Sequence, residues 1–503
     1  MFWPFNIRKR QEERIERLQS SFPTIEKIGE KLTPNLRALR LAMTIGDTML
    51  SMGVPASRVV SRLLDITETY CKRPVHIDVS ADIIMLSQLR GIDKEPLTLI
   101  RPVVPRVINN MTLQLIQQLV YDIRAGKYSL EEAETRLNSI LKEPIVYPSW
   151  LVTTGNALIA TGVSMMFSDN WRVWLLTFVI AIMVDRLLAF LFNRGITSFF
   201  RQICAAAFVT MAAACINQLT ISGVDFFADM QPTLIIVGGI VMLVAGLMIV
   251  GAIQDAIEEY YVTANARILK VILLTLGIVV GIMIGLYVAS KLGMGIYVSP
   301  DPLSLNTLTY QVIGSAVAAA GFAIGTQTRM RAVLWAGLMG ASALVIMYSA
   351  LRLDISVVPA SGVAATVVGL IATLFSRRWK TPSTGIIAAG ILPLVPGLAL
   401  FNGLMQLANY PPGDPLFERG IATLFTAFAT ALAIAIGASL GSMLGRPLHH
   451  QAVHKRNVQP FTAFIYSQFE NAHRHKLSQF DLLGHLAHLL HHDNEKDQDK
   501  PKL

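Results

Sequence analysis

Two aspartates lie in or beside long apolar segments, where a carboxylate is costly. Asp185 lies inside the segment 172–192, and Asp255 follows the segment 232–252. Ionisable residues at membrane depth are rare and usually functional. Each of these carboxyls could carry a coupling proton, and Asp185 could instead pair with a cationic group of a substrate. The alternative for Asp185 is a structural or interfacial position. Two of the three acids Asp255, Glu258 and Glu259 could simply form a solvated loop face, and Asp255, which is nearest the membrane, is the preferred candidate.

A second group of residues is able to break a membrane helix. Pro393 and Pro396 each remove a backbone donor, and Gly397 follows them. The half-helix after the break would offer unpaired N–H groups and a partial positive charge, which suit the carboxylate of an amino acid. The freed carbonyls are tolerated at this depth only beside protein or a polar cavity. A proline kink that serves packing alone is the alternative.

Glycine and amide side chains inside other apolar segments extend this candidate site. Interhelical hydrogen bonds are the alternative role for the amides. Asp255 and Asp185 are the predicted proton-coupling residues. The predicted substrate-binding residues are Pro393, Pro396, Gly397, Asn402, Gly246 and Asn156.

The composition excludes several classes of protein. Of the 503 residues, 53% are hydrophobic and 15% are charged, whereas a soluble globular chain has about 25% charged residues. The net charge of +9 is typical of membrane loops rich in Lys and Arg, so no nucleic-acid partner is expected. Three cysteines form no disulfide framework. The chain lacks the GxxxxGK[ST] and HExxH motifs, so we expect no ATP drive, enzyme activity, cofactor or metal.

The apolar residues must be arranged in helices that position these groups. A membrane span needs about 20 mostly apolar residues. The pattern predicts an N-terminal α/β domain (1–148), two five-helix membrane repeats (149–290 and 307–445) and a tail (446–503). The ten predicted spans are 149–167, 172–192, 199–217, 232–252, 268–290, 307–325, 332–350, 357–376, 384–405 and 420–444.

Lysines and arginines in the short loops orient the spans. They concentrate on one side, which should be cytoplasmic. Both termini then lie inside a bacterial plasma membrane, which requires an even number of spans. The richer side carries Arg194, Arg201, Arg267, Lys270, Arg329, Arg331, Arg377, Arg378, Lys380 and Arg446, and the other side carries Arg172, Lys291, Arg352 and Arg419.

A repeated pattern relates the two groups of five spans. Residues 239–247 match residues 390–398 at six positions, including two glycines and two leucines. The spans that follow carry small residues at every fourth position, from Gly277 and from Ala429. A unit with an odd number of spans returns in the opposite orientation. The sequence therefore predicts an inverted repeat, which in many secondary transporters places the site at broken helices.

The two ends of the chain are polar. Residues 35–70 and 111–141 have helical patterns, whereas residues 75–79 alternate as a strand and residues 83–86 could form another. These elements predict the small N-terminal domain. Nine of the ten histidines follow residue 448. Of these, His485, His488 and His492 share one helical face and could bind a metal. The preferred interpretation is an interfacial or partner-binding helix with a pH-sensitive face.

The chain resembles the threonine/serine exporters, especially the single-chain type from actinobacteria, over residues 38–445. The motifs that carry the resemblance are Ile45-Gly-Asp47 with Leu50-Ser-Met-Gly53, His76-Ile-Asp-Val79, Gln254-Asp255 with Val262-Thr-Ala-Asn-Ala-Arg267, and Ile391-Leu-Pro-Leu-Val-Pro-Gly-Leu398. The resemblance implies a cytoplasmic N-terminal domain, ten spans and export of threonine and serine driven by the proton-motive force. Asp255 and Pro393–Gly397 match family motifs, whereas Asp185 and the tail do not.

We therefore expect a secondary active exporter of small hydroxy amino acids. One alternative is an exporter or facilitator of another small polar metabolite. Another is a membrane-anchored sensor or enzyme whose activity lies in residues 1–148. The sequence leaves open the substrate range, the coupling stoichiometry, homo-oligomer formation and the roles of the N-terminal domain and the tail.

Overall fold

The computed structural model describes residues 33–445, apart from residues 72, 90–94, 143–145, 228–231, 242, 244–245, 295–304 and 380–382. All described residues belong to one compact unit, which extends to residue 448. The histidine-rich tail 446–503 lies outside the described residues. Its predicted helix, and the preference for an interfacial role over a metal site, therefore stay predictions.

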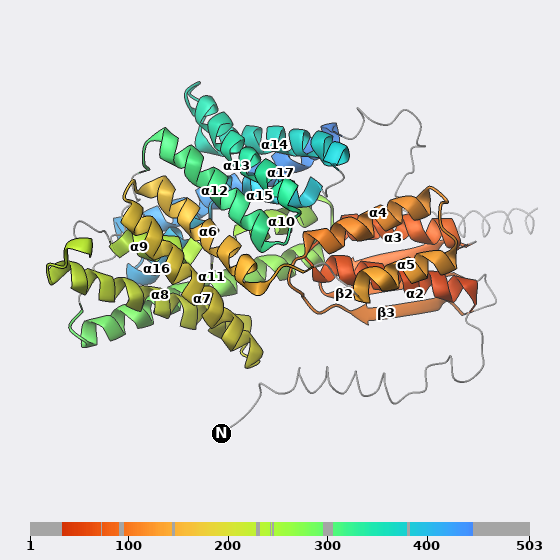
Figure 1. Ribbon diagram of the computed structural model, residues 1–503, viewed down its shortest axis with the longest axis horizontal. Helices are drawn as coiled ribbons and strands as arrows, with labels where there is room; N and C mark the ends of the chain where they lie inside the picture. Colours follow the sequence, from red (N-terminus) through yellow and green to blue (C-terminus); the bar gives the residue numbers. More distant parts are fainter. Residues whose placement is uncertain are drawn as a thin grey trace, which may run out of the picture. The chain divides into compact units, whose positions relative to one another are not determined.

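The N-terminal region begins with two helices, α2 (Pro34–Ser51) and α3 (Ala56–Tyr70) (Figure 1). Thr33 caps α2 by accepting a hydrogen bond from the backbone N–H of Leu36, and a proline occupies the first helical position. Gly53 lies in the turn between the two helices and has a φ of 83°, a conformation that glycine adopts at little cost. The predicted helical pattern over residues 35–70 is thus divided at Gly53.

A three-stranded antiparallel sheet follows, formed by β1 (Val75–Ser80), β2 (Ile83–Gln88) and β3 (Leu97–Pro102) in that order. Val75 pairs with Gln88, and Ile83 pairs with Pro102. Alternate residues of β1 and β2 are buried, as expected for a sheet with one covered face. The sequence pattern predicted β1 and the possible β2. It missed β3, whose residues are only half-buried or exposed.

Two more helices, α4 (Asn110–Arg124) and α5 (Leu130–Lys142), complete the N-terminal region. Apolar residues from α2 to α5 and from the sheet form one hydrophobic core. This confirms a small N-terminal region with helices and strands. The predicted helical stretch 111–141 is divided by a turn at Gly126, where φ is 71°.

The rest of the described chain is helical (Figure 1). By length and hydropathy, eight of these helices can cross a membrane, or nine if the bent pair α15–α16 counts as one span. Their bounds are α6 (Ser149–Phe167), α7 (Trp171–Asn193), α8 (Ser198–Ile221), η2 (Asp225–Phe227), α9 (Pro232–Val241), α10 (Gly246–Ile257), α11 (Tyr261–Lys291), α12 (Leu308–Gly325), α13 (Met330–Leu351), α14 (Val357–Trp379), α15 (Ser383–Ile391), η3 (Leu392–Leu394), α16 (Gly397–Asn409) and α17 (Pro415–Leu444).

The predicted count of ten spans is not reached by this measure. The predicted fourth span, 232–252, is divided into α9 and α10, and neither helix is long enough to cross a bilayer alone. The predicted ninth span, 384–405, is divided at η3, and its two parts are bent by 48°. Both predicted spans that carry the repeated glycine motif are therefore broken.

Small residues form many of the contacts between the membrane helices. Alanine is frequent among their buried residues, whereas some large apolar side chains are exposed, Phe425 to 74%. A β-carbon added to Gly281 would lie 2.4 Å from the carbonyl oxygen of Ile203 on α8. One added to Gly441 would lie 2.0 Å from that of Thr366 on α14. Because only glycine permits such close approach, both predicted stripes of small residues set helix–helix contacts.

Candidate functional site

The two broken helices meet at their breaks. A β-carbon added to Gly246, the first residue of α10, would lie 2.6 Å from Cγ1 of Val395 and 3.6 Å from Cα of Gly397, the first residue of α16. The N-terminal ends of α10 and α16 are therefore neighbours. Each helix N-terminus carries unpaired N–H groups and a partial positive charge. Two such ends side by side can bind a carboxylate.

The start of α16 has no side-chain cap. Its N-cap residue, Pro396, makes no side-chain capping hydrogen bond, and η3 places Pro393 in the preceding turn. The backbone N–H of Gly397 donates to the carbonyl of Val395 at 2.8 Å. From the sequence, the free donors are expected from Gly397 onward, the first residue after the two prolines. In the structure the Gly397 donor is used within the turn, so the donors available for a ligand begin at Leu398.

Asn402 lies on α16, five residues after Gly397, and is half-buried. Its neighbour Phe401 packs in an apolar cluster with residues of α7, α8, α9 and α11. The structure thus places Asn402 on the helix that begins at the break. No direct contact between Asn402 and Gly246 or Gly397 is defined.

Sequence reasoning missed Gln202, which lies on α8 beside the first break. Its Nε2 donates to the carbonyl of Leu243 at 2.9 Å. Its Oε1 is buried and accepts no hydrogen bond within the described part of the chain. A buried acceptor without a partner costs about 1–3 kcal/mol, so this oxygen is suited to a donor from a ligand. Gln202 escaped notice because it precedes the apolar run of its span.

Asp185 and Asn156 come together, but at a different place in the molecule. The Asp185 carboxylate accepts from Asn156 Nδ2 at 2.8 Å and from Thr153 Oγ1 at 2.6 Å, which joins α7 to α6. Arg186 Nη2 lies 2.7 Å from Asp185 Oδ2. Adjacent helical residues point to different faces, yet the long side chain of Arg186 turns back to its neighbour. Asp185 is thus fully engaged in this cluster.

Asp255, at the end of α10, is completely buried. One carboxylate oxygen lies 2.5 Å from Arg267 Nη1 on α11. The other accepts at 3.2 Å from the backbone N–H of Ala56, at the N-terminus of α3. Asp255 is therefore not part of a solvated loop face, whereas the two acids that follow it, Glu258 and Glu259, are exposed. Asp255 lies beyond the predicted span, beneath the N-terminal region. Burial raises the pKa of its carboxyl, and the Arg267 guanidinium opposes part of this rise.

Broken helices that meet inside a multi-pass membrane protein, with an ionisable residue near the end of one of them, define a membrane transporter of the broken-helix type. Two family models match the chain: "Putative threonine/serine exporter" over residues 40–289 and "Threonine/Serine exporter, ThrE" over residues 311–444. The chain belongs to this threonine/serine exporter family, whose members are transporters and not enzymes.

Two relatives extend this comparison. A "Probable threonine/serine exporter" of Mycobacterium tuberculosis is 32% identical over 402 residues, which are 78% of this chain and 74% of the relative. The "Threonine/serine exporter" of Corynebacterium glutamicum is 29% identical over 377 residues, which are 74% and 76% of the two chains. No solved structure matches the chain.

Proposed function

We propose that this protein exports threonine and serine, and that it binds them where α10 and α16 meet. The observation that carries the proposal is the close approach of Gly246 to Val395 and Gly397. The two helix N-termini suit the substrate carboxylate. The carbonyl of Leu243 lies at the same break. Carbonyls that lack helical donors there suit the substrate ammonium or hydroxyl group.

An inverted repeat, also part of this proposal, would explain why both breaks carry the same motif. Its support is a parallel set of helix contacts. Within each set of five spans the third helix packs on the fifth: α8 on α11, and α14 on α17. Between the sets, α10 packs on α17 as α16 packs on α11. Each contact has its counterpart in the other half.

The crossing of α6 with α12 supports the same symmetry. A β-carbon added to Gly155 would lie 2.8 Å from the carbonyl of Gly321, and one added to Gly162 would lie 2.5 Å from that of Gly314. The two glycines are seven residues apart in each helix, since 162 − 155 = 7 and 321 − 314 = 7, and they meet in reverse order. A two-fold axis through this crossing produces such reciprocal contacts.

For energy coupling we propose that Asp255 exchanges a proton during the cycle and that Asp185 is a structural residue. The support is the difference between their surroundings. Asp255 has a single charged partner, Arg267, and a raised pKa. Asp185 is held by two neutral donors and by Arg186, which leaves little scope for a change of partner.

Transport by purified protein tests the function. Proteoliposomes loaded with threonine should take up labelled threonine or serine by counterflow, and an imposed proton gradient should drive net transport that stops when the gradient is collapsed. Counterflow of other small polar metabolites but of neither hydroxy amino acid would contradict the assignment. Net transport that is independent of the proton gradient would contradict the proton coupling but not the export of threonine and serine.

Gln202→Leu should weaken serine and threonine binding about tenfold, because leaving a buried hydroxyl donor unpaired costs about 1–3 kcal/mol and about 1.4 kcal/mol is a factor of ten in affinity. Alanine, which has no hydroxyl, should lose less. Calorimetry on the purified variant measures both affinities. Gln218→Leu is the matched control, since Gln218 lies exposed on the same helix. Equal losses for all three amino acids would exclude hydroxyl recognition by Gln202.

Both termini should lie in the cytoplasm, so that residues 218–231 and 406–419 face outward. In a cysteine-free background, Ser222→Cys and Pro412→Cys should react with an impermeant maleimide on intact cells. Thr197→Cys, in the loop between α7 and α8, should react only after lysis. If Ser222→Cys and Pro412→Cys label on opposite sides, the inverted repeat is wrong.

A further inference from the structure

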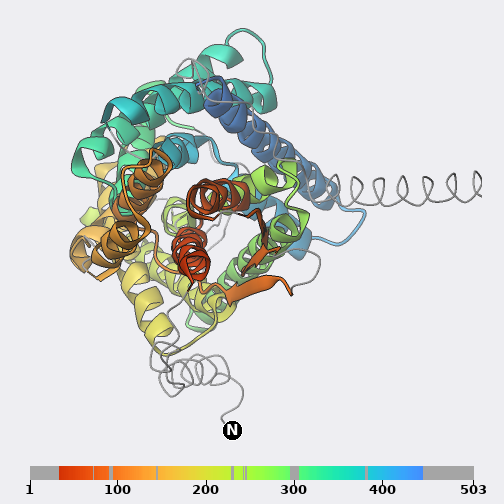
Figure 2. The same cartoon turned by 90° about the vertical axis from the view of Figure 1, so that its right-hand side faces the viewer.

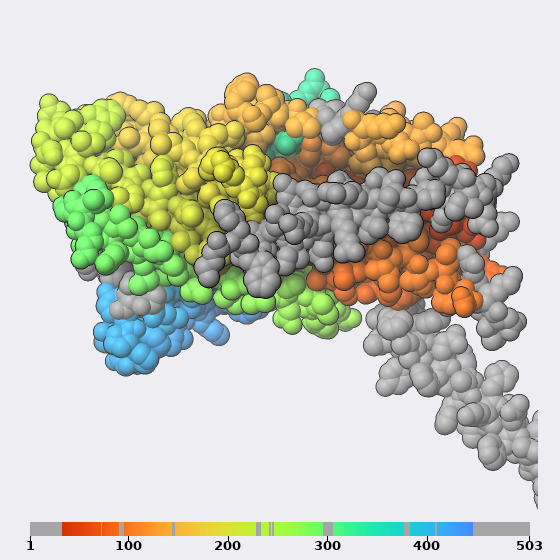
Figure 3. Space-filling model, turned by 90° about the horizontal axis from the view of Figure 1, so that it is seen from below, coloured from red at the N-terminus to blue at the C-terminus, as the bar shows by residue number. Residues whose placement is uncertain are grey.

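The N-terminal region touches the membrane helices at two separate places, one in each set of five spans. The first attachment is to the loop between α10 and α11. Besides the Asp255–Ala56 hydrogen bond, the hydroxyl of Ser57 contacts Glu258, and the backbone N–H of Ala81 donates to Thr263 Oγ1 at 3.0 Å. Figure 2 shows the red helices of the N-terminal region beside the green start of α11, and Figure 3 shows the green atoms bordering the orange strands.

The second attachment is to the loop between α12 and α13. Asn110 Nδ2 donates to the hydroxyls of Thr326 at 3.0 Å and Thr328 at 2.9 Å, and its backbone N–H donates to the Thr326 carbonyl. Asn109 Nδ2 donates to Gln327 Oε1 at 3.2 Å. All five residues are buried. Gln327 has a φ of 53°. Residues other than glycine rarely adopt this backbone conformation unless the surrounding structure holds them in it.

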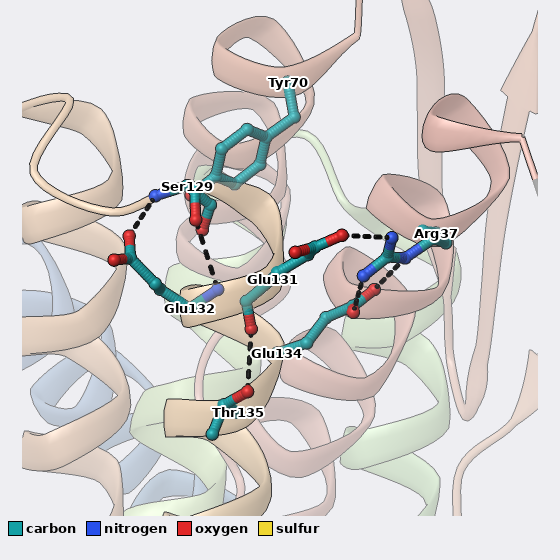
Figure 4. A network of polar contacts seen from close by, with 7 residues as sticks. All are labelled: Arg37, Tyr70, Ser129, Glu131, Glu132, Glu134 and Thr135. Carbon is teal, nitrogen blue, oxygen red and sulfur yellow. Dashed lines mark hydrogen bonds and ion pairs between the residues drawn. The ribbon is translucent and has the colours of Figure 1, made fainter.

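The N-terminal region is built to move as one body. Arg37 binds Glu134 at 2.6 Å and Glu131 at 3.1 Å and so joins α2 to α5 (Figure 4). The hydroxyl of Tyr70 donates to the carbonyl of Tyr128 at 2.9 Å, which ties α3 to the turn before α5. With a common hydrophobic core, these contacts keep the distance between the two attachments fixed.

We propose that the N-terminal region is a clamp across the cytoplasmic ends of the two membrane halves, and that the cycle requires the first attachment to release while the second holds. This rests on the proposed export function. Alternating access requires the two membrane halves to move relative to each other. A rigid body that is fixed to both halves prevents this movement. The first attachment is the one that opens because its rim is exposed, at Glu258 and Tyr261. The second is a buried, fully paired network of neutral groups.

A reversible cross-link tests the clamp. In a cysteine-free full-length background, Ser57→Cys with Glu258→Cys places two thiols across the first attachment. Arg37→Cys with Glu134→Cys is the matched control, because it joins α2 to α5 within the N-terminal region. A short bis-methanethiosulfonate bridges each pair, and a reductant releases it. Threonine export is measured in proteoliposomes before and after bridging and again after reduction.

Bridging the first attachment should reduce export at least tenfold, leave threonine binding intact and allow recovery on reduction. Bridging the control pair should leave export unchanged. Export that continues with the first attachment bridged would overturn the clamp, as would equal inhibition by the control bridge. If the unbridged protein exports neither amino acid, the proposed function fails; this outcome is distinct from a clamp that does not have to open.

Discussion

Gly246→Ala is expected to abolish export, because one methyl group closes the meeting point of the two broken helices. The added carbon would lie 2.6 Å from Cγ1 of Val395, and a β-branched side chain has little freedom to turn away. The ends of α10 and α16 must then separate, and the donors at their N-termini no longer converge. We expect threonine affinity to fall more than tenfold, as measured by calorimetry, with expression and melting temperature largely retained.

Gly251→Ala provides the matched control for this change. It lies on the same helix, but its added carbon would meet only Arg267 Nη1, at an ordinary 3.7 Å. Gly397→Val should weaken binding as Gly246→Ala does. Replacing both Pro393 and Pro396 by Ala should restore helical hydrogen bonds and also weaken transport. Unchanged affinity in Gly246→Ala and Gly397→Val would place the substrate elsewhere and leave the prolines as a packing kink.

Asp255→Asn is expected to remove proton-driven export while substrate exchange continues at a reduced rate. The amide keeps the hydrogen-bonding shape but cannot release a proton. The change also leaves Arg267 half-buried without its partner, and breaking a buried pair can cost about 3–5 kcal/mol. Melting temperature must therefore be measured beside transport. Net export under an imposed pH gradient and counterflow without a gradient separate coupling from binding.

The double variant Asp255→Asn with Arg267→Gln distinguishes coupling from stability. It removes both charges, so it should regain much of the stability and the exchange activity that the single change loses. It should still fail to respond to the proton gradient. Equal loss of driven export and exchange in the double variant, at restored stability, would mark Asp255 as a structural or substrate-binding residue.

The break in the ninth predicted span was predictable from local chemistry, whereas the break in the fourth was not. Proline cannot complete a helix, so Pro393 and Pro396 interrupt the ninth predicted span whatever surrounds them. The fourth predicted span contains no such pair of prolines, and its glycines indicated only a flexible helix. In the structure this span is also divided, into α9 and α10. Neither part is long enough to cross a membrane alone, so the number of spanning helices is lower than predicted. Hydropathy alone, which averages over such a break, could not reveal it.

The candidate carboxylates show a second limit of sequence reasoning. Both Asp185 and Asp255 are predicted to couple protons, because each lies in or beside an apolar segment, although only Asp255 matches a family motif. The structure separates them: Asp185 binds two neutral donors of α6, whereas Asp255 binds Arg267 and a backbone N–H of the N-terminal region. The donor at Ala56 is 199 residues away in sequence. A backbone N–H has no side-chain signature, so its partner depends on which chain segments meet.

The apolar segments, the small N-terminal region, the proline break and the family resemblance were all predictable from the sequence. They follow from properties of single segments: apolar length, residue period, helix-breaking residues and local motifs. Three contacts were not predictable: Gly246 with Val395 and Gly397, Gln202 with the first break, and the N-terminal region with both membrane halves. The physical reason is that these contacts join segments many residues apart. Their geometry is set by the packing of small residues between helices, which depends on the partner helix as much as on the segment itself.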